Sequence, residues 1–298
     1  MIEGLLDSAA PLIMAGLGAL LSDLSGALGI FIEGFMISGA FFSWIFAGWT
    51  GSVFLGTLTS AALAAFAGWG LARFVRLSGA NPFMAGLALN LAASGITLSL
   101  SAHWFGTKGV LWNSAVKIPG PVTIPLIGGV PFAGGILSGH NPFTYTAFAC
   151  ALVIATAVRR TVFGFRLRAS GLSPDAAAVR GVRSGAYREA AWAAAAFLSA
   201  LAGASLTFRV GAYAPGGIAG RGWIALAAVY LGFRKVWGVV LAAFVFSLAE
   251  RLGYGFQSVS ALPATALLGL PSAIALLFYF LSLLPGKRRG GISDRKKQ

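Results

Sequence analysis

The sequence predicts an all-α polytopic membrane protein with about nine transmembrane helices, and three observations carry this prediction. Hydrophobic residues make up 57% of the 298 residues, whereas charged residues make up only 10%. Because soluble domains carry about 25% charged residues, this composition cannot build a water-soluble surface. The apolar residues form long runs, and the net charge of +14 lies between them. This arrangement excludes a nucleic-acid binder, which would gather its positive charge on one soluble face.

The apolar runs divide the chain into its predicted elements. A hydrocarbon core of about 30 Å needs about 20 apolar residues in a straight helix, and fewer where the helix is broken. On this basis we assign nine segments, in order: 9–21, 30–47, 53–72, 83–105, 143–158, 190–208, 223–232, 236–249 and 261–284. Several are too short to span alone. They lie beside two glycine-rich stretches, 21–30 and 210–223, where we therefore expect broken helices.

The basic residues predict the orientation, because cytoplasmic loops carry an excess of Lys and Arg. Seventeen of the 22 Lys and Arg residues fall in four regions, namely 73–76, 159–188, 234–235 and 285–298. All four are cytoplasmic if the chain crosses nine times with its N-terminus outside and its C-terminus inside. We therefore expect one domain over 1–298, with a cytoplasmic loop at 159–188, an extracytoplasmic loop at 106–141 and a basic cytoplasmic tail at 285–298.

Two stretches of the chain superpose with an offset of 188 residues. One is GALGIFIEGFMISGAF at 26–41 and the other is YAPGGIAGRGWIALAAVY at 213–230, so that Glu33-Gly34 falls on Arg221-Gly222. Each pair opens an apolar helix after a glycine-rich break. The segments around the two breaks cross in opposite directions, which is the pattern of an inverted repeat. In transporters with such repeats, broken helices meet near the midplane and form the substrate path.

Glu33 and Arg221 are the ionisable residues most deeply embedded in predicted membrane. An ionised group at the bilayer centre costs at least about 2.5 to 3.5 kcal/mol, so such residues usually pair or face a water-filled path. One interpretation is that both residues line a central cavity, as a pair. The other is that each caps its own broken helix, since a negative charge at a helix start offsets the helix dipole.

Other candidates for the substrate path are uncharged. Asn90 is the one amide inside a long predicted span, where it is either a solute contact or a hydrogen-bonding link between helices. Phe31 and Trp223 belong to an aromatic cluster at the two repeats, and their rings would suit stacking on a flat heterocycle as well as ordinary packing. His103 and His140 lack partners at metal-ligand spacing, so we expect no metal site and no cofactor.

The cytoplasmic loop contains a predicted short helix. Ser173 supplies a capping hydroxyl, Pro174 occupies the first helical position, and Asp175 places an acid in the first turn. The helix continues through Ala177 and ends at Gly181. It is either a docking element for a cytoplasmic partner or a helix on the lipid surface. Because the chain lacks a phosphate-binding G-x-x-x-x-G-K-[ST] loop, any ATP hydrolysis must occur on another chain.

Four stretches resemble the inner-membrane permease subunits of ABC importers for simple sugars, especially the nucleoside branch. They are APLIMAGLGALLSDLSG with IEGFMISGAF at 10–41, NPFMAGLALNL at 81–91, GFRLRASGLSPDAAAVRGV at 164–182, and AGRGWIALAAVYLG at 219–232. The resemblance implies that the Ser173 to Gly181 helix is the coupling helix that docks on an ATPase subunit. It also implies three further partners, namely a second, similar permease, an extracytoplasmic solute-binding lipoprotein and membrane lipid. The chain would then be a multi-pass protein of the bacterial inner membrane without enzymatic activity of its own.

The chain departs from the nucleoside branch just before Glu33. Gly29 and Phe31 stand where that branch usually has Asn and then Gly. Riboflavin importer permeases are similar to these proteins, and an added aromatic ring would suit an isoalloxazine. We therefore expect a solute with a flat heterocycle and a polyhydroxylated arm, either a nucleoside or riboflavin. A simple sugar remains an alternative, and so does an autonomous ion-coupled transporter, which the inverted repeat alone would allow.

Overall fold

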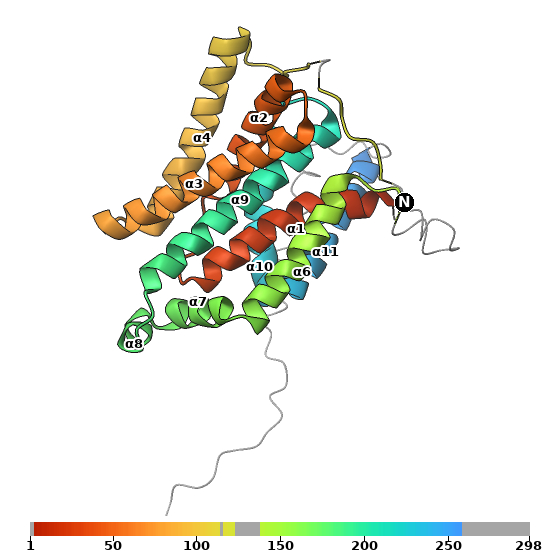
Figure 1. Ribbon diagram of the computed structural model, residues 1–298. Helices are drawn as coiled ribbons and strands as arrows, with labels where there is room; N and C mark the ends of the chain where they lie inside the picture. Colours follow the sequence, from red (N-terminus) through yellow and green to blue (C-terminus); the bar gives the residue numbers. More distant parts are fainter. Residues whose placement is uncertain (1–2, 114–115, 123–137, 258–298) are drawn as a thin grey trace, which may run out of the picture.

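The computed structural model describes residues 3–113, 116–122 and 138–257, and most of this part of the chain is helical (Figure 1). Its helices are α1 (Glu3–Leu24), α2 (Ile32–Thr50), α3 (Val53–Ser78), α4 (Pro82–Phe105), α6 (Pro142–Arg160), α7 (Val162–Leu172), α8 (Pro174–Val179), α9 (Ser184–Val210), α10 (Arg221–Leu231) and α11 (Val236–Gln257). Six of them, α1, α2, α3, α4, α6 and α9, are long and apolar enough to cross a membrane. The chain is thus consistent with a polytopic membrane protein.

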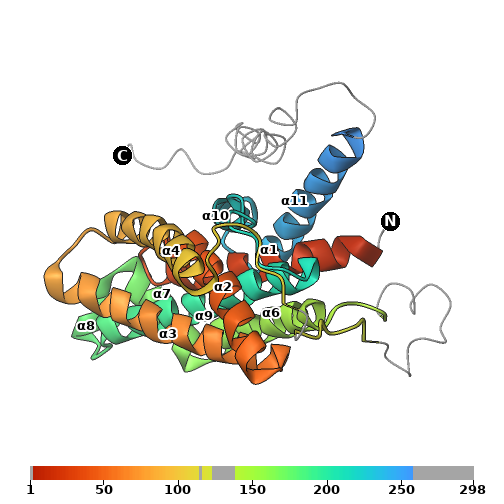
Figure 2. The same ribbon diagram turned by 90° about the horizontal axis from the view of Figure 1, so that it is seen from above.

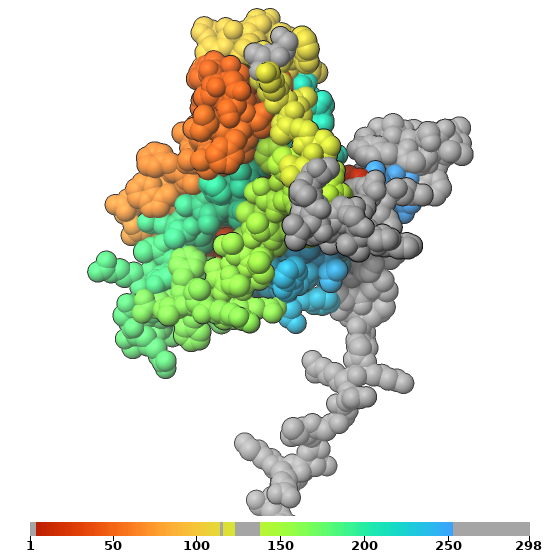
Figure 3. All heavy atoms as spheres, turned by 45° about the vertical axis from the view of Figure 1, so that its right-hand side comes forward, coloured from red at the N-terminus to blue at the C-terminus, as the bar shows by residue number. Residues whose placement is uncertain are grey.

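Helices α1 and α9 form the centre of the bundle. They pack against each other, and α9 also packs against α2 and α3 while α1 packs against α6, α10 and α11. Figure 2 shows α4, α10 and α11 on one side of this pair and α3 and α6 on the other. Space-filling atoms show α6 and α7, in green, covering the lower part of one face (Figure 3). Most side chains in the apolar stretches of α1 and α9 are therefore buried inside the protein.

Small residues let the backbones of α2 and α9 touch. A Cβ atom at Gly39 would collide with the backbone of Ala200, and one at Gly203 would collide with the carbonyl oxygen of Met36. Helices in lipid gain little from the hydrophobic effect against one another, so close van der Waals contact at small residues drives their association. The glycines at this crossing therefore bring α2 to its position on the central pair.

The contacts between helices repeat across the bundle. Helix α1 can be matched to α9, α10 to α2, and α11 to α3. Under this matching, the contacts α1–α10, α1–α11 and α10–α11 correspond to the contacts α9–α2, α9–α3 and α2–α3. The pairs α1–α9 and α2–α10 map onto themselves. This correspondence is consistent with two similar units, α1 to α3 and α9 to α11, that contain the stretches 26–41 and 213–230; the inverted orientation of the two units stays a prediction.

The basic regions of the described chain gather at one end of the bundle. Arg76 near the end of α3 forms an ion pair with Glu189 at the start of α9, with 2.7 Å between Nη2 and Oε1. The turn between α10 and α11 lies beside the end of α1, where Arg234 Nε donates to Asp23 Oδ2 at 2.5 Å. Helices α7 and α8 lie at this end as well (Figure 1). At the opposite end, Asp7 Oδ1 accepts a hydrogen bond from Thr144 Oγ1 at the start of α6.

Both predicted breaks are confirmed, because helix stops at Leu24 and resumes at Ile32, and stops at Val210 and resumes at Arg221. Several predicted bounds were too narrow: α1 begins well before residue 9 and α11 continues past residue 249. The loop at 159–188 holds an additional helix, α7, that was not predicted. The predicted segment 261–284 and the tail 285–298 lie outside the described residues.

Candidate functional site

The two breaks meet, and a carboxylate joins them. Glu33 is the second residue of α2, and its side chain reaches the first turn of α10. Its Oε1 accepts a hydrogen bond from the Gly220 backbone N–H at 3.0 Å, and its Oε2 accepts one from the Gly222 N–H at 2.6 Å. The first N–H groups of a helix have no partner within the helix and carry the positive end of its dipole. Glu33 therefore caps the broken helix of the other repeat rather than its own.

Local sequence makes this contact possible. Gly220, the residue before α10, has φ of 80°, a conformation that favours glycine. A Cβ atom at Gly222 would lie 2.6 Å from both the Cα and the Oε2 of Glu33. The G-R-G sequence thus turns the chain into α10 and leaves room for the glutamate beside the helix start.

Asn90 on α4 holds the other break. Its Nδ2 donates to the carbonyl oxygen of Ile30 at 2.8 Å, and its Oδ1 accepts from the N–H of Gly34 at 2.7 Å. The residue is only 8% exposed. Both ends of the amide are thus engaged with the backbone on either side of the point where α2 begins. In this conformation Asn90 links two helices, as one of the two sequence interpretations held, and its place in the substrate path stays a prediction.

Arg221 does not pair with Glu33, in contrast to the suggested pairing. Its Nη1 donates to the Gly217 carbonyl at 3.0 Å, and its Nε lies 3.4 Å from Oε1 of Glu250 on α11. Sequence reasoning missed Glu250 because the predicted segment ended at residue 249, before the adjacent charges of Glu250 and Arg251. The sequence did contain a signal for this pair. Glu250 directly follows the apolar run 236–249 and has the opposite charge to Arg221, the first residue of α10.

Phe31 and Trp223 differ in their surroundings. The ring of Phe31 is fully buried, 4.7 Å from the ring of Trp192 and 5.5 Å from that of Phe35 between centroids. A Cβ atom at Gly29 would lie 2.5 Å from Ser22 Oγ and 2.8 Å from Phe31 Cζ. The glycine at 29 thus makes room for the phenylalanine at 31. Trp223, in the first turn of α10, is 45% exposed.

The short helix in the loop forms as the sequence predicted. Ser173 Oγ accepts a hydrogen bond from the N–H of Ala176 at 3.4 Å, Pro174 occupies the first turn beside Asp175, and the chain leaves the helix at Gly181 with φ of 75°. Only Ala177 is buried, whereas Val179 at the end of α8 and Leu172, the last residue of α7, are 89% and 85% exposed. The helix α8 therefore presents an open surface at the arginine-rich end of the bundle.

An aromatic pocket of about 440 Å³ opens at the opposite end of the bundle. It lies between the end of α2, the end of α4 and residues 107–113, and its lining includes Trp44, Trp49, Phe105, Trp112 and Asn113. Pockets of this kind, apolar and aromatic with a few polar groups, are typical of small-molecule sites.

Residues 1–284 match the model of the family described as branched-chain amino acid transport system, permease component. The chain belongs to this permease family. The permease is 32% identical to the guanosine ABC transporter permease protein NupQ of Bacillus subtilis, over 82% of this chain and 78% of the relative. It is 29% identical to the nucleoside ABC transporter permease protein NupC of Lactococcus lactis, over 96% of this chain and 92% of that relative. A Haloferax volcanii protein, provisionally assigned as a glucose ABC transporter permease, is 27% identical over 87% and 78%.

Three polar side chains of the permease, Glu33, Asn90 and Arg221, lie near the place where α2 and α10 meet. Glu33 and Asn90 satisfy backbone groups that the broken helices leave open, and Arg221 is joined to Glu250. Unsatisfied polar groups inside a membrane cost several kcal/mol each. The junction of α2, α4 and α10 is thus a polar site inside the bundle whose hydrogen bonds depend on the relative position of the two repeats.

Proposed function

We propose that the permease is the transmembrane subunit of an ATP-driven importer and that its solute passes beside the junction of α2 and α10. The observation that carries this proposal is the capping of α10 by Glu33, because it makes one repeat sensitive to movement of the other. Movement of one repeat against the other around a central site is the general mode of alternating access in such folds. Family membership supports the transport role, and an ATPase on another chain would supply the energy.

The first test of this proposal is transport itself. Proteoliposomes that contain the permease, a second permease and the ATPase, with the solute-binding lipoprotein on the outside, should accumulate labelled solute only when ATP is enclosed with the ATPase. Uptake driven by a proton or sodium gradient without the ATPase would instead identify an autonomous transporter.

The path is tested at the polar junction. Glu33→Gln and Arg221→Gln should each reduce uptake severely at equal membrane abundance, because both alter the bonds at the start of α10. Glu189→Gln is the matched control, since that acid pairs with Arg76 between α3 and α9 and should leave most uptake intact. Normal uptake by both junction variants would contradict a path at this place.

The solute class we propose is a nucleoside-like molecule with a flat heterocycle. The names of two relatives, a guanosine and a nucleoside permease, support it, and so does the aromatic pocket at the outer end of α2. Uptake of labelled guanosine, labelled riboflavin and labelled glucose, each measured with the other two as unlabelled competitors, would separate the three candidates. Uptake of glucose alone, unaffected by guanosine or riboflavin, would overturn the heterocycle proposal in favour of a sugar.

We propose nine crossings with the N-terminus outside and the C-terminus inside, in a bacterial inner membrane. The clustering of Arg76, the turn at Arg234, and helices α7 and α8 at one end of the bundle supports this orientation, since basic loops stay in the cytoplasm. An extracytoplasmic binding lipoprotein would then deliver solute to the opposite end, where the aromatic pocket opens.

The helix α8 is the docking element that we propose for the ATPase. Ala177→Pro removes the N–H that donates to the Ser173 carbonyl at 3.0 Å and should disrupt the helix. The expected result is insertion of the permease at normal abundance with loss of ATPase co-purification. Ala178→Ser, an exposed position of the same helix, is the control and should retain the ATPase. Normal co-purification with the Ala177→Pro variant would contradict docking through α8.

A further inference from the structure

Helix α7 has the character of a helix at a membrane surface. It begins at Val162, directly after the Thr161 that ends the apolar helix α6, and lies across the end of the bundle (Figure 1). Its outward side chains alternate between large apolar groups and arginines, with Phe165 69% exposed beside Arg166 and Arg168. Helices that combine exposed aromatic or aliphatic side chains with basic residues lie at the boundary between head groups and acyl chains.

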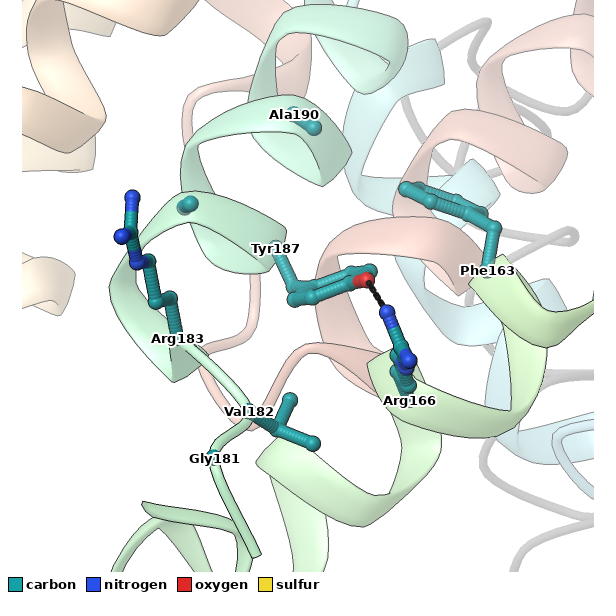
Figure 4. Close-up of a pocket in the computed structure, with 8 residues that line it drawn as sticks. Phe163, Arg166, Gly181, Val182, Arg183, Tyr187 and Ala190 are labelled. Atoms are coloured by element: carbon teal, nitrogen blue, oxygen red, sulfur yellow. Dashed lines mark hydrogen bonds between the residues drawn. The ribbon is translucent and has the colours of Figure 1, made fainter.

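A pocket of about 400 Å³ lies between α7 and the start of α9 (Figure 4). Its lining includes Phe163, Arg166, Val182, Arg183, Tyr187 and Ala190. The phenolic oxygen of Tyr187 accepts a hydrogen bond from Arg166 Nη1 at 3.2 Å, and the rings of Tyr187 and Phe163 lie 5.6 Å apart. The pocket therefore combines a positioned guanidinium with an apolar wall.

The charge around this pocket is predominantly positive. Residues 159–188 contain seven arginines and a single acid, Asp175. The neighbouring acid, Glu189, is engaged by Arg76 at 2.7 Å on the side of α9 that faces α3. Arg166 and Arg183 thus lie in a strongly positive region, and guanidinium groups are well suited to phosphate oxygens.

We propose that this pocket binds an anionic phospholipid of the cytoplasmic leaflet. The phosphate would lie beside Arg166, with Arg183 adding positive charge at the far side of Tyr187 (Figure 4), and an acyl chain would run along Phe163 and the small exposed side chain of Ala190. Lipid is favoured because α7 exposes large apolar side chains, Val162 and Phe165 among them, on the same short helix as its arginines, which is the composition of helices that lie at a lipid surface. Anionic lipids also concentrate at the cytoplasmic surface, where basic clusters attract them.

The bound lipid would also act on the loop to α8. Residues 181–183 connect α8 to α9 and supply part of the lining. Occupancy of the pocket would therefore hold the base of α8 against α7.

The test measures lipid binding by the full-length purified permease, by native mass spectrometry with added phosphatidylglycerol or phosphatidylcholine. The double variant Arg166→Gln/Arg183→Gln should bind phosphatidylglycerol about tenfold more weakly, with binding of phosphatidylcholine unchanged. The control Arg159→Gln/Arg160→Gln removes the same charge outside the pocket and should change binding much less. An equal loss in both double variants would overturn the proposal, since it would show general surface attraction only.

Further measurements separate the other occupants. Millimolar inorganic phosphate should not displace the lipid, and full displacement would mean a site for free phosphate. Loss of ATPase co-purification by Arg166→Gln/Arg183→Gln with unchanged lipid binding would identify the pocket as a protein contact. If that double variant does not fold, Tyr187→Phe decides: it keeps the ring and removes the oxygen that positions Arg166, so it should weaken phosphatidylglycerol binding, and normal binding would contradict the proposal.

Discussion

At the scale of single residues, polar side chains inside the bundle satisfy the backbone where helices are interrupted. Glu33 accepts hydrogen bonds from two backbone N–H groups at the start of α10. Asn90 donates a hydrogen bond to one backbone carbonyl and accepts one from a backbone N–H at the start of α2. A carboxylate bonded by backbone N–H groups forms strong, charge-assisted hydrogen bonds. In a soluble protein, water can form hydrogen bonds with the backbone groups that a helix break leaves open. Here Glu33 and Asn90 form these hydrogen bonds instead.

Replacing Asn90 tests this at the break before α2. Asn90→Ala leaves the Ile30 carbonyl and the Gly34 N–H unpaired in a buried place, at a cost of about 1–3 kcal/mol each. We expect a lower melting temperature of the purified permease. Ser99→Ala, at an exposed position of the same helix, should melt like the wild type. Equal melting temperatures for all three proteins would show that the break does not depend on the amide.

Gly222 tests the close approach of Glu33 to α10. Gly222→Ala places a Cβ atom 2.6 Å from the Glu33 Cα and Oε2, and overpacking of this kind costs about 1–3 kcal/mol. The expected results are a lower melting temperature and reduced ATP-dependent uptake. In contrast, Gly95→Ala on α4 meets open space and should be neutral or slightly stabilising, because alanine favours helix by about 1 kcal/mol. A harmless Gly222→Ala would be evidence against a tight contact between the repeats.

At the scale of helices, α9 organises the bundle because it contacts α1, α2 and α3 along its length. Its composition explains this position: alanines and Gly203 leave a surface on which neighbouring backbones approach closely. The helices α1, α10 and α11 make the same set of contacts among themselves as α9, α2 and α3 do. The bundle thus contains one packing arrangement twice.

The crossing of α2 and α9 is tested at Gly203. Gly203→Ala directs a methyl group at the Met36 carbonyl oxygen and should force the two helices apart, destabilising the bundle by about 1–3 kcal/mol. Thermal unfolding measured beside Gly70→Ala, whose methyl group meets no atom within 4 Å, provides the comparison. If the two variants unfold at the same temperature, backbone contact at this crossing contributes little.

At the scale of the whole molecule, the two ends of the bundle differ in chemistry. One end carries the arginines of α7 and of the turns beside α8 and α10, whereas the other carries the aromatic pocket. With the arginine-rich end in the cytoplasm, as we propose, ATPase docking and solute entry would take place on opposite sides of the membrane.

Cysteine labelling tests this orientation. Cys150 is the single cysteine, so Cys150→Ala provides a background for Lys108→Cys and Asp175→Cys. A membrane-impermeant maleimide should label intact cells at position 108 only, and position 175 only after the membrane is opened. Labelling of position 175 in intact cells would reverse the topology.

Features that depend on neighbouring residues could be predicted from the sequence, whereas features that depend on residues far apart in the chain could not. The helix at Ser173 and the breaks near Ile30 and Gly220 were predicted correctly, because caps, prolines and glycines act within a few residues. Helix α7 was missed, since its arginines and two glycines are typical of a loop. Glu250 was missed because charges at the end of an apolar run usually mark the end of a span.

The sequence alone determined that this is a helical membrane protein with two interrupted helices, because composition and hydrophobic runs decide which segments lipid accepts. It also placed a capped helix among the arginines. Only the tertiary structure decided that Glu33 caps α10, that Arg221 pairs with Glu250, and that Asn90 serves the backbone of α2. These partners lie far apart along the chain, and each is selected by the packing of whole helices rather than by local spacing.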